Sequence, residues 1–363
     1  MTTERSAQLT SNLPIPPGEI LEEELETIGM SQAELAARTG RPAQAINEII
    51  RGRKALTHDT ALELEKVLGI PAHIWTNLES QYRLTLAQEE EREHLERQQE
   101  RLREFPVREM EKRGWIDFHD DPVEKTRALL AFLGFASFDA WEHSWQNPAM
   151  GYRVTGKRPI TIPSLAVWMR RGEIEANAIK TAPYDEKRFR LAVQNMRSLT
   201  TAPAGEMIPA MQEECAAAGV AVAVVQELPK IGANGVAKWL TSSKALIQMN
   251  IRYRWHDIFW FSFIHECFHV LRHRLREVYV DGINVDADEE REANTYAENI
   301  LIPPSHWAEF LEEHDTVSAE DVRSFANDID IHPGIVVGRM HNDKVVARDR
   351  MNELRDRFRW VST

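Results

Sequence analysis

The sequence predicts a multidomain, mainly α-helical protein that ends in an α+β domain with a small antiparallel sheet. Three observations lead to this prediction. Helical apolar spacing dominates the chain up to about Arg197, β-prone segments gather between Gly219 and Arg252, and a charged stretch interrupts the helical part. A length of 363 residues is enough for two or three domains.

Composition indicates a soluble globular protein, with 28% charged and 43% apolar residues. The start of the chain lacks the basic and apolar segments of a signal peptide, and the most apolar run, 258–264, is too short to span a bilayer. Two cysteines, Cys215 and Cys267, favour a reducing compartment. We therefore expect a cytoplasmic protein with no membrane contact. Because the net charge is −13, any binding to nucleic acid needs a local basic patch.

The first helical region contains two short helices that are joined by a tight turn. Ser31 is a good N-cap and Glu34 completes a capping box. The helix Gln32–Arg38 should end at Gly40, and a second helix should run over Pro42–Ile50. This is the plan of a helix-turn-helix, whose second helix lies in the major groove of DNA.

Each face of this motif has a predicted role. Its core would contain Leu35, Ala36, Ile46, Ile49 and Ile50. The positions expected to face outward and meet base edges are Arg41, Gln44, Ala45 and Asn47. The basic cluster expected at phosphates is Arg38, Arg51, Arg53 and Lys54. A helical bundle that binds only protein is the alternative, and the acidic composition favours it, whereas the basic cluster favours DNA.

Residues 16–83 resemble the XRE/Cro family, and within it the HigA-type antitoxins, through SQAELAARTGRPAQAINEIIRGRKALTHDTALELEKVLGIPAHIW. The resemblance implies repression of the protein's own operon and neutralisation of a toxin ribonuclease partner. We expect a homodimer that binds a short palindromic operator in double-stranded DNA. HigA-type antitoxins are usually short single domains, so the long C-terminal extension is a departure.

The segment after this domain predicts little chemistry. Residues 89–104 are almost all charged or amide and contain neither Gly nor Pro, which indicates a solvated linker helix. Leu95 and Leu102 are seven residues apart, but two positions are too few for a coiled-coil seam. The following region is helical, and its aromatic residues are expected in a core: Phe132, Phe135, Phe138, Trp141 and Trp145.

The sequence His265-Glu266-Cys267-Phe268-His269 carries the strongest chemical signal of the chain. It is an H-E-x-x-H motif, which places two imidazoles on one helix face and a carboxylate beside them. Such a pair can share a zinc ion, and Glu266 would act on the water at the metal. A helix starting near Asp286 should supply the third ligand; Glu290 is the first choice and Glu292 the second. Asn294 lies one turn beyond Glu290, where it could hydrogen-bond a ligand histidine.

Other candidates near the motif have weaker roles. Three histidines spaced i, i+4 and i+8 span about 12 Å, so His273 is not expected to join the ligands. Cys267 lies about 200° around the helix from His265 and should point away. His332 could be a proton donor lining the zinc cleft or a plain loop histidine, and the plain role is favoured. A buried helix whose histidines are merely hydrogen-bonded is the alternative to a metal site.

Residues 185–345 resemble the ImmA/IrrE-type zinc metallopeptidase domain. The resemblance is carried by ELPKIGANGVAKWL, IQMNIRYRWHDIFWFSFIHECFHVLRH and EEREANTYAENILIP. It implies a zincin-like helix pair packed on a small sheet, with His265, His269 and Glu290 as ligands and Glu266 as general base. The family's H-E-L-G-H reads HECFH here, so both middle residues differ.

The predicted organisation has six parts, and three functions remain open. The parts are a flexible N-terminus (1–17), the helix-turn-helix domain (18–88), a charged linker helix (89–105), a helical connecting region (106–184), the zinc domain (185–345) and a tail (346–363). The first hypothesis is a transcriptional regulator or antitoxin with a regulatory or vestigial zinc domain. The second is a zinc metalloendopeptidase that cleaves a repressor or toxin partner, with the helix-turn-helix used for targeting. The third makes the zinc purely structural.

Overall fold

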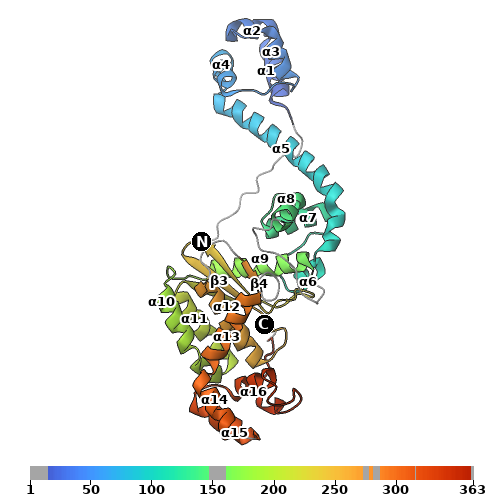
Figure 1. Cartoon of the computed structure of the whole chain (residues 1–363). Helices are drawn as coiled ribbons and strands as arrows, with labels where there is room; N and C mark the ends of the chain where they lie inside the picture. Colours follow the sequence, from blue (N-terminus) through green and yellow to red (C-terminus); the bar gives the residue numbers. More distant parts are fainter. Residues whose placement is uncertain (1–14, 147–160, 273–277, 281–286, 315, 361–363) are drawn as a thin grey trace, which may run out of the picture. The chain divides into compact units, whose positions relative to one another are not determined.

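The computed structural model describes residues 15–146, 161–272, 278–280, 287–314 and 316–360 (Figure 1). The chain divides into two compact units. The first contains the residues up to Glu100 together with 121–126, and the second contains 101–120 and the residues from Arg127 onward. In the part of the chain that the structure describes, no helix is both long and apolar enough to cross a membrane.

Five helices lie in the first unit. They are α1 (Pro17–Ile28), α2 (Gln32–Thr39), α3 (Ala43–Ile50), α4 (His58–Leu68) and α5 (Ala72–Gln98). The five predicted core residues are all buried, and Trp75 of α5 is completely buried beside them. The predicted core of the helix-turn-helix is therefore confirmed.

The boundaries of α2 follow from its capping residues. The Ser31 hydroxyl accepts a hydrogen bond from the Glu34 backbone N–H at 3.1 Å. The Glu34 carboxylate accepts a hydrogen bond from Arg38 at 2.5 Å. Only the Ser31 half of the predicted capping box therefore forms. Gly40 ends the helix at φ +68°, a left-handed conformation that favours glycine. Pro42 caps α3 from outside the helix and is not its first residue.

The prediction that the charged stretch forms a separate linker helix is wrong. Helix α5 continues without a break from Ala72 through the charged stretch to Gln98, and a 3₁₀ helix follows over Gln99–Glu104. No Gly or Pro interrupts residues 72–105, so helix formers carry the helix past the predicted boundary at 88. Leu95 is buried, so this stretch is not solvated on every side.

The second unit is an α+β domain. Its helices are α6 (Val107–Lys112), the part of α7 (Pro122–Leu133) from Arg127 onward, α8 (Phe138–Gln146), α9 (Ile162–Ala178), α10 (Glu186–Asn195), α11 (Ala204–Ala217), α12 (His256–Arg272), α13 (Ala287–Leu301), α14 (Pro304–Glu313), α15 (Ala319–Asp328) and α16 (Pro333–Asn342). Its strands are β1 (Val220–Val224), β2 (Gly235–Thr241), β3 (Lys244–Met249) and β4 (Val278–Val280). Short 3₁₀ helices lie at Ser198–Thr201 and Asn352–Leu354.

The four strands form a mixed sheet in the order β1-β3-β2-β4. Strand β2 is antiparallel to both β3 and β4, whereas β1 runs parallel to β3, with Val220 opposite Ala245. The predicted fold class is confirmed, but the prediction of an antiparallel sheet is wrong for β1. Strand β1 is buried at its first four residues and helices α9 and α11 pack on it, as is typical of a parallel strand.

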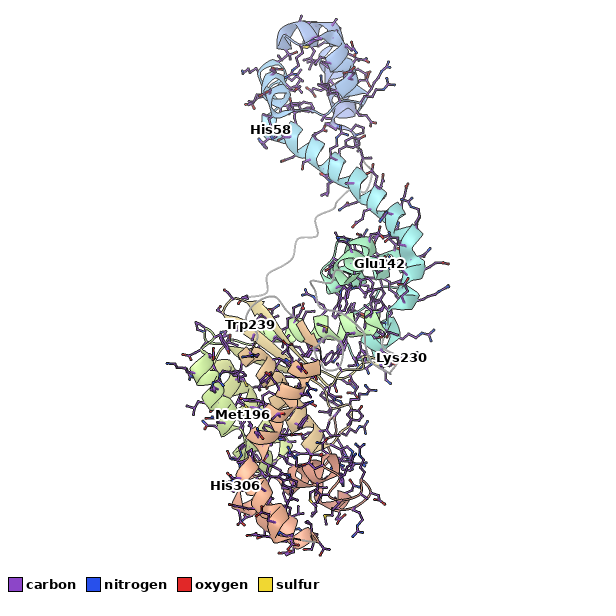
Figure 2. All side chains as sticks on the ribbon, in the orientation of Figure 1. His58, Glu142, Met196, Lys230, Trp239 and His306 are labelled. Atoms are coloured by element: carbon purple, nitrogen blue, oxygen red, sulfur yellow. The ribbon has the colours of Figure 1, made fainter. Side chains whose placement is uncertain are left out.

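The expected boundary at 185 does not separate two folding regions. Helix α9 packs on β1 and β3, and the Trp168 indole N–H donates to the Val225 carbonyl at 3.3 Å. The Gln248 amide donates to the Trp168 carbonyl at 2.7 Å. Figure 2 labels Met196, which is completely buried in the core of the same unit. Of the predicted aromatic core, Phe138 and Trp141 are buried, whereas the other three are partly exposed.

The predicted C-terminal tail instead packs on the start of α12. Arg355 donates two hydrogen bonds to the Asp257 carboxylate, at 3.0 and 2.7 Å, and both side chains are about nine-tenths buried. The Phe358 backbone N–H donates to the Arg254 carbonyl at 2.6 Å. A buried, bidentate ion pair is sensitive to the loss of either partner. The segment around Arg355 therefore anchors the helix that carries H-E-x-x-H.

Candidate metal centre and helix-turn-helix surface

Helix α12 carries the two histidines through the core of the second unit. Phe263 and Ile264 are buried just before the motif and Val270 just after it. His265 is 4% exposed and His269 is 2% exposed. Their Nε2 atoms are 3.1 Å apart, because residues four apart lie on the same helix face.

Helix α13 brings Glu290 to the same point. One carboxylate oxygen of Glu290 is 3.6 Å from His265 Nε2, and the other is 3.9 Å from His269 Nε2. One ligand atom from each of the three residues lies within 4.8 Å of the others. The structure thus brings together the three residues that the sequence predicts as ligands.

Asn294 orients the first histidine. Its Oδ1 lies 3.0 Å from His265 Nδ1, so that ring nitrogen donates and the lone pair of Nε2 faces Glu290 and His269. Ligand histidines commonly have such a partner on the far ring nitrogen. Asn294 therefore occupies the supporting position predicted for it.

Glu266 is fully buried beside the histidines, against the start of β2. A Cβ on Gly235 would lie 2.6 Å from Glu266 Cγ and 2.8 Å from its Oε1. The strand therefore approaches this carboxylate as closely as it does because residue 235 has no side chain. Sequence reasoning missed this role of Gly235, which the spacing within the H-E-x-x-H motif could not reveal.

The remaining candidates lie away from the three ligand atoms. Glu292 is exposed, and Cys267 is completely buried in the core, where burial raises the pKa of its thiol well above the usual value. His332 caps α16: its Nδ1 accepts from the Gly334 N–H at 3.0 Å, and its Nε2 is 3.2 Å from Asp356. This supports the plain role for His332. His273 lies outside the described residues.

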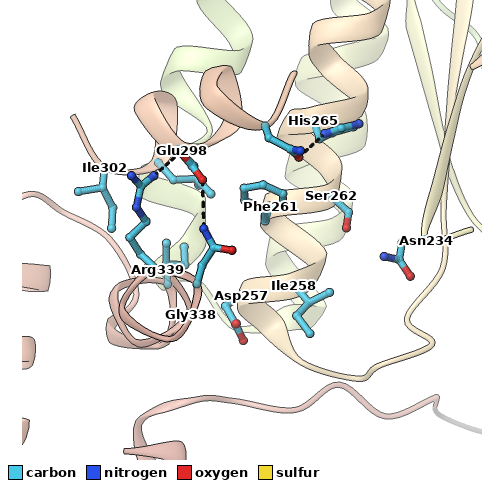
Figure 3. A pocket seen from close by; sticks show the side chains of 14 residues that line it. Asn234, Asp257, Ile258, Phe261, Ser262, His265, Glu298, Ile302, Gly338 and Arg339 are labelled. Atoms are coloured by element: carbon cyan, nitrogen blue, oxygen red, sulfur yellow. Dashed lines mark hydrogen bonds and ion pairs between the residues drawn. The ribbon is translucent and has the colours of Figure 1, made fainter. Parts of the chain in front are cut away.

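A cavity of about 300 Å³ opens beside His265 (Figure 3). It lies between helices α12, α13 and α16, and both His265 and Asn294 line it. Glu298 and Arg339 form an ion pair of 2.8 Å in its wall, and Asn342 donates to Glu298 at 3.3 Å. The cavity adjoins the ligand cluster through His265.

The helix-turn-helix surface differs in part from its prediction. Arg51, Arg53 and Lys54 follow α3 and are exposed, and among the described residues their side chains form no ion pair. Arg38 instead pairs with Glu34 on α2. The predicted phosphate-binding cluster is thus reduced to three free cations.

The predicted base-contacting positions are also engaged differently. Arg41 pairs with Glu63 of α4. Gln44 is exposed and donates to Glu48 at 2.9 Å, and Asn47 donates to Gln32 of α2 at 3.1 Å.

Ala45 is 7% exposed, so the prediction that it faces outward is wrong. It is buried together with Ile46 in α3, which packs against α1 and α2. Sequence reasoning also missed Gln32, whose amide oxygen ties the two helices of the motif together.

Comparisons with known proteins concern the first unit. Residues 21–75 match the family model described as Helix-turn-helix. Virulence-associated protein I of Dichelobacter nodosus is 40% identical over 77 residues, which are 21% of this chain and 71% of that protein. The uncharacterized HTH-type transcriptional regulator YddM of Escherichia coli (strain K12) is 29% identical over 72 residues, 20% of this chain and 77% of that protein.

Among solved structures, that of the Pseudomonas aeruginosa antitoxin HigA with the higBA promoter is 37% identical, covers 21% of this chain and 83% of that chain, and has a TM-score of 0.20. The match to the family model lies wholly within the first unit. Through this N-terminal domain the chain belongs to the XRE-type helix-turn-helix family.

Proposed function

We propose that the protein is a DNA-binding transcriptional regulator. The observation that carries the proposal is the helix-turn-helix of residues 21–75, with exposed cations at Arg51, Arg53 and Lys54 directly after α3. Positive charges next to a groove-binding helix contact phosphates, and the polar α3 positions Gln44 and Asn47 can read bases. Binding an operator places the regulator in the cytoplasm.

The test is a salt series on double-stranded DNA selected by the protein from a random-sequence pool. Lys54→Ala should weaken binding to all sequences and lower the salt slope by about 1, because one phosphate contact is lost. Lys66→Ala is the matched control, since Lys66 is an exposed lysine of α4 in the same domain. Equal effects of the two changes, or failure to select DNA, would contradict the proposal.

A homodimer on a palindromic operator and a toxin partner belong to the same proposal. The resemblance of residues 16–83 to HigA-type antitoxins supports both. A dimer predicts two half-sites about one helical turn apart in the selected DNA. Single half-sites would contradict the dimer.

We further propose that the second unit is a zinc metalloendopeptidase domain. The observation that favours it is the convergence of His265, His269 and Glu290 within 4.8 Å, with Glu266 buried alongside. Two imidazole nitrogens and one carboxylate oxygen fit a catalytic zinc site, in which three protein ligands leave one position open. Structural zinc sites usually have four protein ligands, whereas the described residues group three here.

The proposed mechanism assigns one task to each residue. When bound, zinc supplies Lewis-acid chemistry and eases the ionisation of water. Glu266 accepts the proton of the attacking water and returns it to the leaving amine. Asn294 fixes the ring of His265 by accepting from Nδ1–H. The substrate would be a repressor or toxin partner of the regulator.

The test combines zinc content with cleavage of a mixed fluorogenic peptide library by the full chain. Glu266→Gln should retain zinc and abolish cleavage, because the carboxylate acts as base and not as ligand. Cleavage by Glu266→Gln at the wild-type rate would exclude this mechanism, and a wild-type protein that binds no zinc would exclude the metal site.

A further inference from the structure

Three helices build the cavity beside His265, and each does so with one face. On α12 four of the five lining residues are spaced i, i+3, i+4 and i+7, namely Ile258, Phe261, Ser262 and His265, and Asp257 is the fifth. On α13 the lining begins with Asn294, Glu298 and Leu301, and on α16 it comprises Ile335, Gly338, Arg339 and Asn342. Figure 3 shows these side chains around one common space. A ligand histidine and its supporting asparagine are therefore part of the cavity wall.

The size of the cavity suits a single side chain. Its volume of about 300 Å³ is at the lower end of the range of roughly 300–1,000 Å³ that is typical of small-molecule pockets. Five of the lining side chains are apolar: Ile258, Phe261, Leu301, Ile302 and Ile335. Burying an apolar group against them is favourable.

The charges around the cavity are already paired. The Asp257 carboxylate accepts hydrogen bonds from Nε and Nη2 of Arg355, at 3.0 and 2.7 Å. Arg339 lies 2.8 Å from Glu298 and 2.6 Å from Asp343. A charged ligand group would lose hydration on entering and would have to compete with these pairs for a counter-charge.

We propose that this cavity is the subsite for one side chain of the polypeptide substrate, next to the scissile bond, and that it selects a large, uncharged, mainly apolar residue. The inference rests on the proposed peptidase function. Its geometric basis is that His265 offers Nε2 to the ligand cluster while lining the cavity. A backbone carbonyl held at the cluster would thus place a neighbouring side chain at the mouth of the cavity.

The experiment measures binding and not turnover. The probes are five dipeptide hydroxamates, in which a zinc-binding head precedes Ala, Leu, Phe, Lys or Glu, titrated into the zinc-loaded full chain. Leu and Phe should bind at least about tenfold more tightly than Ala, because a missing methylene alone changes discrimination by roughly 10- to 200-fold in a good apolar pocket. Lys and Glu should bind no more tightly than Ala.

A change in the wall separates the subsite from a general effect on the fold. Ile258→Trp narrows the cavity and should weaken binding of the Phe probe about tenfold while leaving the Ala probe within about twofold. Leu191→Trp is the control, because Leu191 is 57% exposed on α10 and does not line the cavity. An equal loss for all five probes in Ile258→Trp would overturn the inference.

The outcomes also distinguish the subsite from the peptidase proposal. Equal affinity for the five probes overturns the subsite and leaves the peptidase proposal intact. Failure of all five probes to bind also overturns the subsite. The expected order of affinities without cleavage of any peptide supports the subsite and contradicts hydrolysis.

Discussion

The helix-turn-helix is formed by residues that are close in the sequence, whereas the candidate metal centre joins residues that are far apart in it. The first uses consecutive helices, and its family match spans residues 21–75. The second brings His265 and His269 of α12 together with Glu290 of α13, and Gly235 of β2 lies against Glu266. A local motif can tolerate a distant change, whereas an assembled site depends on each segment that reaches it.

The two regions also differ in how their charges are used. Around α3 the cations Arg51, Arg53 and Lys54 are exposed, as a phosphate-binding surface requires. Around α12 charged residues are buried and held in ion pairs, as in the Asp257–Arg355 pair. Exposed charges suit binding of a large polyanion, and buried, fixed groups suit positioned chemistry.

The largest effect is expected from a substitution that disrupts the candidate metal centre and leaves the helix-turn-helix unchanged. His269→Ala removes one of the three proposed ligands, so zinc affinity should fall by at least about 100-fold, more than the loss of a supporting residue. DNA binding should stay unchanged. Calorimetric zinc titration measures the effect, and His306→Ala is the control because His306 is exposed on α14. Unaltered zinc affinity in His269→Ala would remove this histidine from the site.

The second-largest expected effect is a pH dependence of the free energy of unfolding that arises in the second unit. Burial, followed by the nearby charge of His332, lowers the pKa of His256 to about 4. The unfolded chain binds the proton with a pKa near 6.5, so the contribution of His256 is present above pH 6.5 and is lost as the pH falls toward 4. We expect a loss of about 2 kcal/mol in the free energy of unfolding between pH 7 and pH 5.

Urea denaturation of the metal-free protein, followed by tryptophan fluorescence, measures this change. All tryptophans except Trp75 lie outside the first unit. His256→Gln should flatten the pH dependence between pH 7 and 5, whereas His306→Gln should retain it. A steep dependence in His256→Gln would assign it to another group.

The smallest expected effect compares one helix cap in each unit. Ser31 caps α2 with a single hydrogen bond, whereas Ser318 and Asp321 form a complete capping box on α15. Ser31→Ala and Ser318→Ala should each cost about 1 kcal/mol. Amide hydrogen exchange should show faster opening of α2 in the first variant and of α15 in the second. Exchange that accelerates in both helices in either variant would show that the two units unfold together.

The sequence was sufficient wherever a structure is decided by neighbouring residues. Ser31 and Gly40 mark the two ends of α2, and the apolar spacing of α2 and α3 predicted five buried residues. The two histidines at i and i+4 lie on one face of their helix. Boundaries failed where no breaker stands, as in α5, and Ala45 failed because small residues suit both a surface and a core.

Tertiary structure decided what depends on distant contacts. The parallel pairing of β1 with β3, the packing of the Arg355 segment on α12 and the approach of Gly235 to Glu266 each join residues far apart in the chain. Spacing encodes only which side chains share an element's face. Which faces then meet is set by burial of the whole apolar surface. The candidate ligand residues were therefore visible in the sequence, but the cavity beside His265 was not.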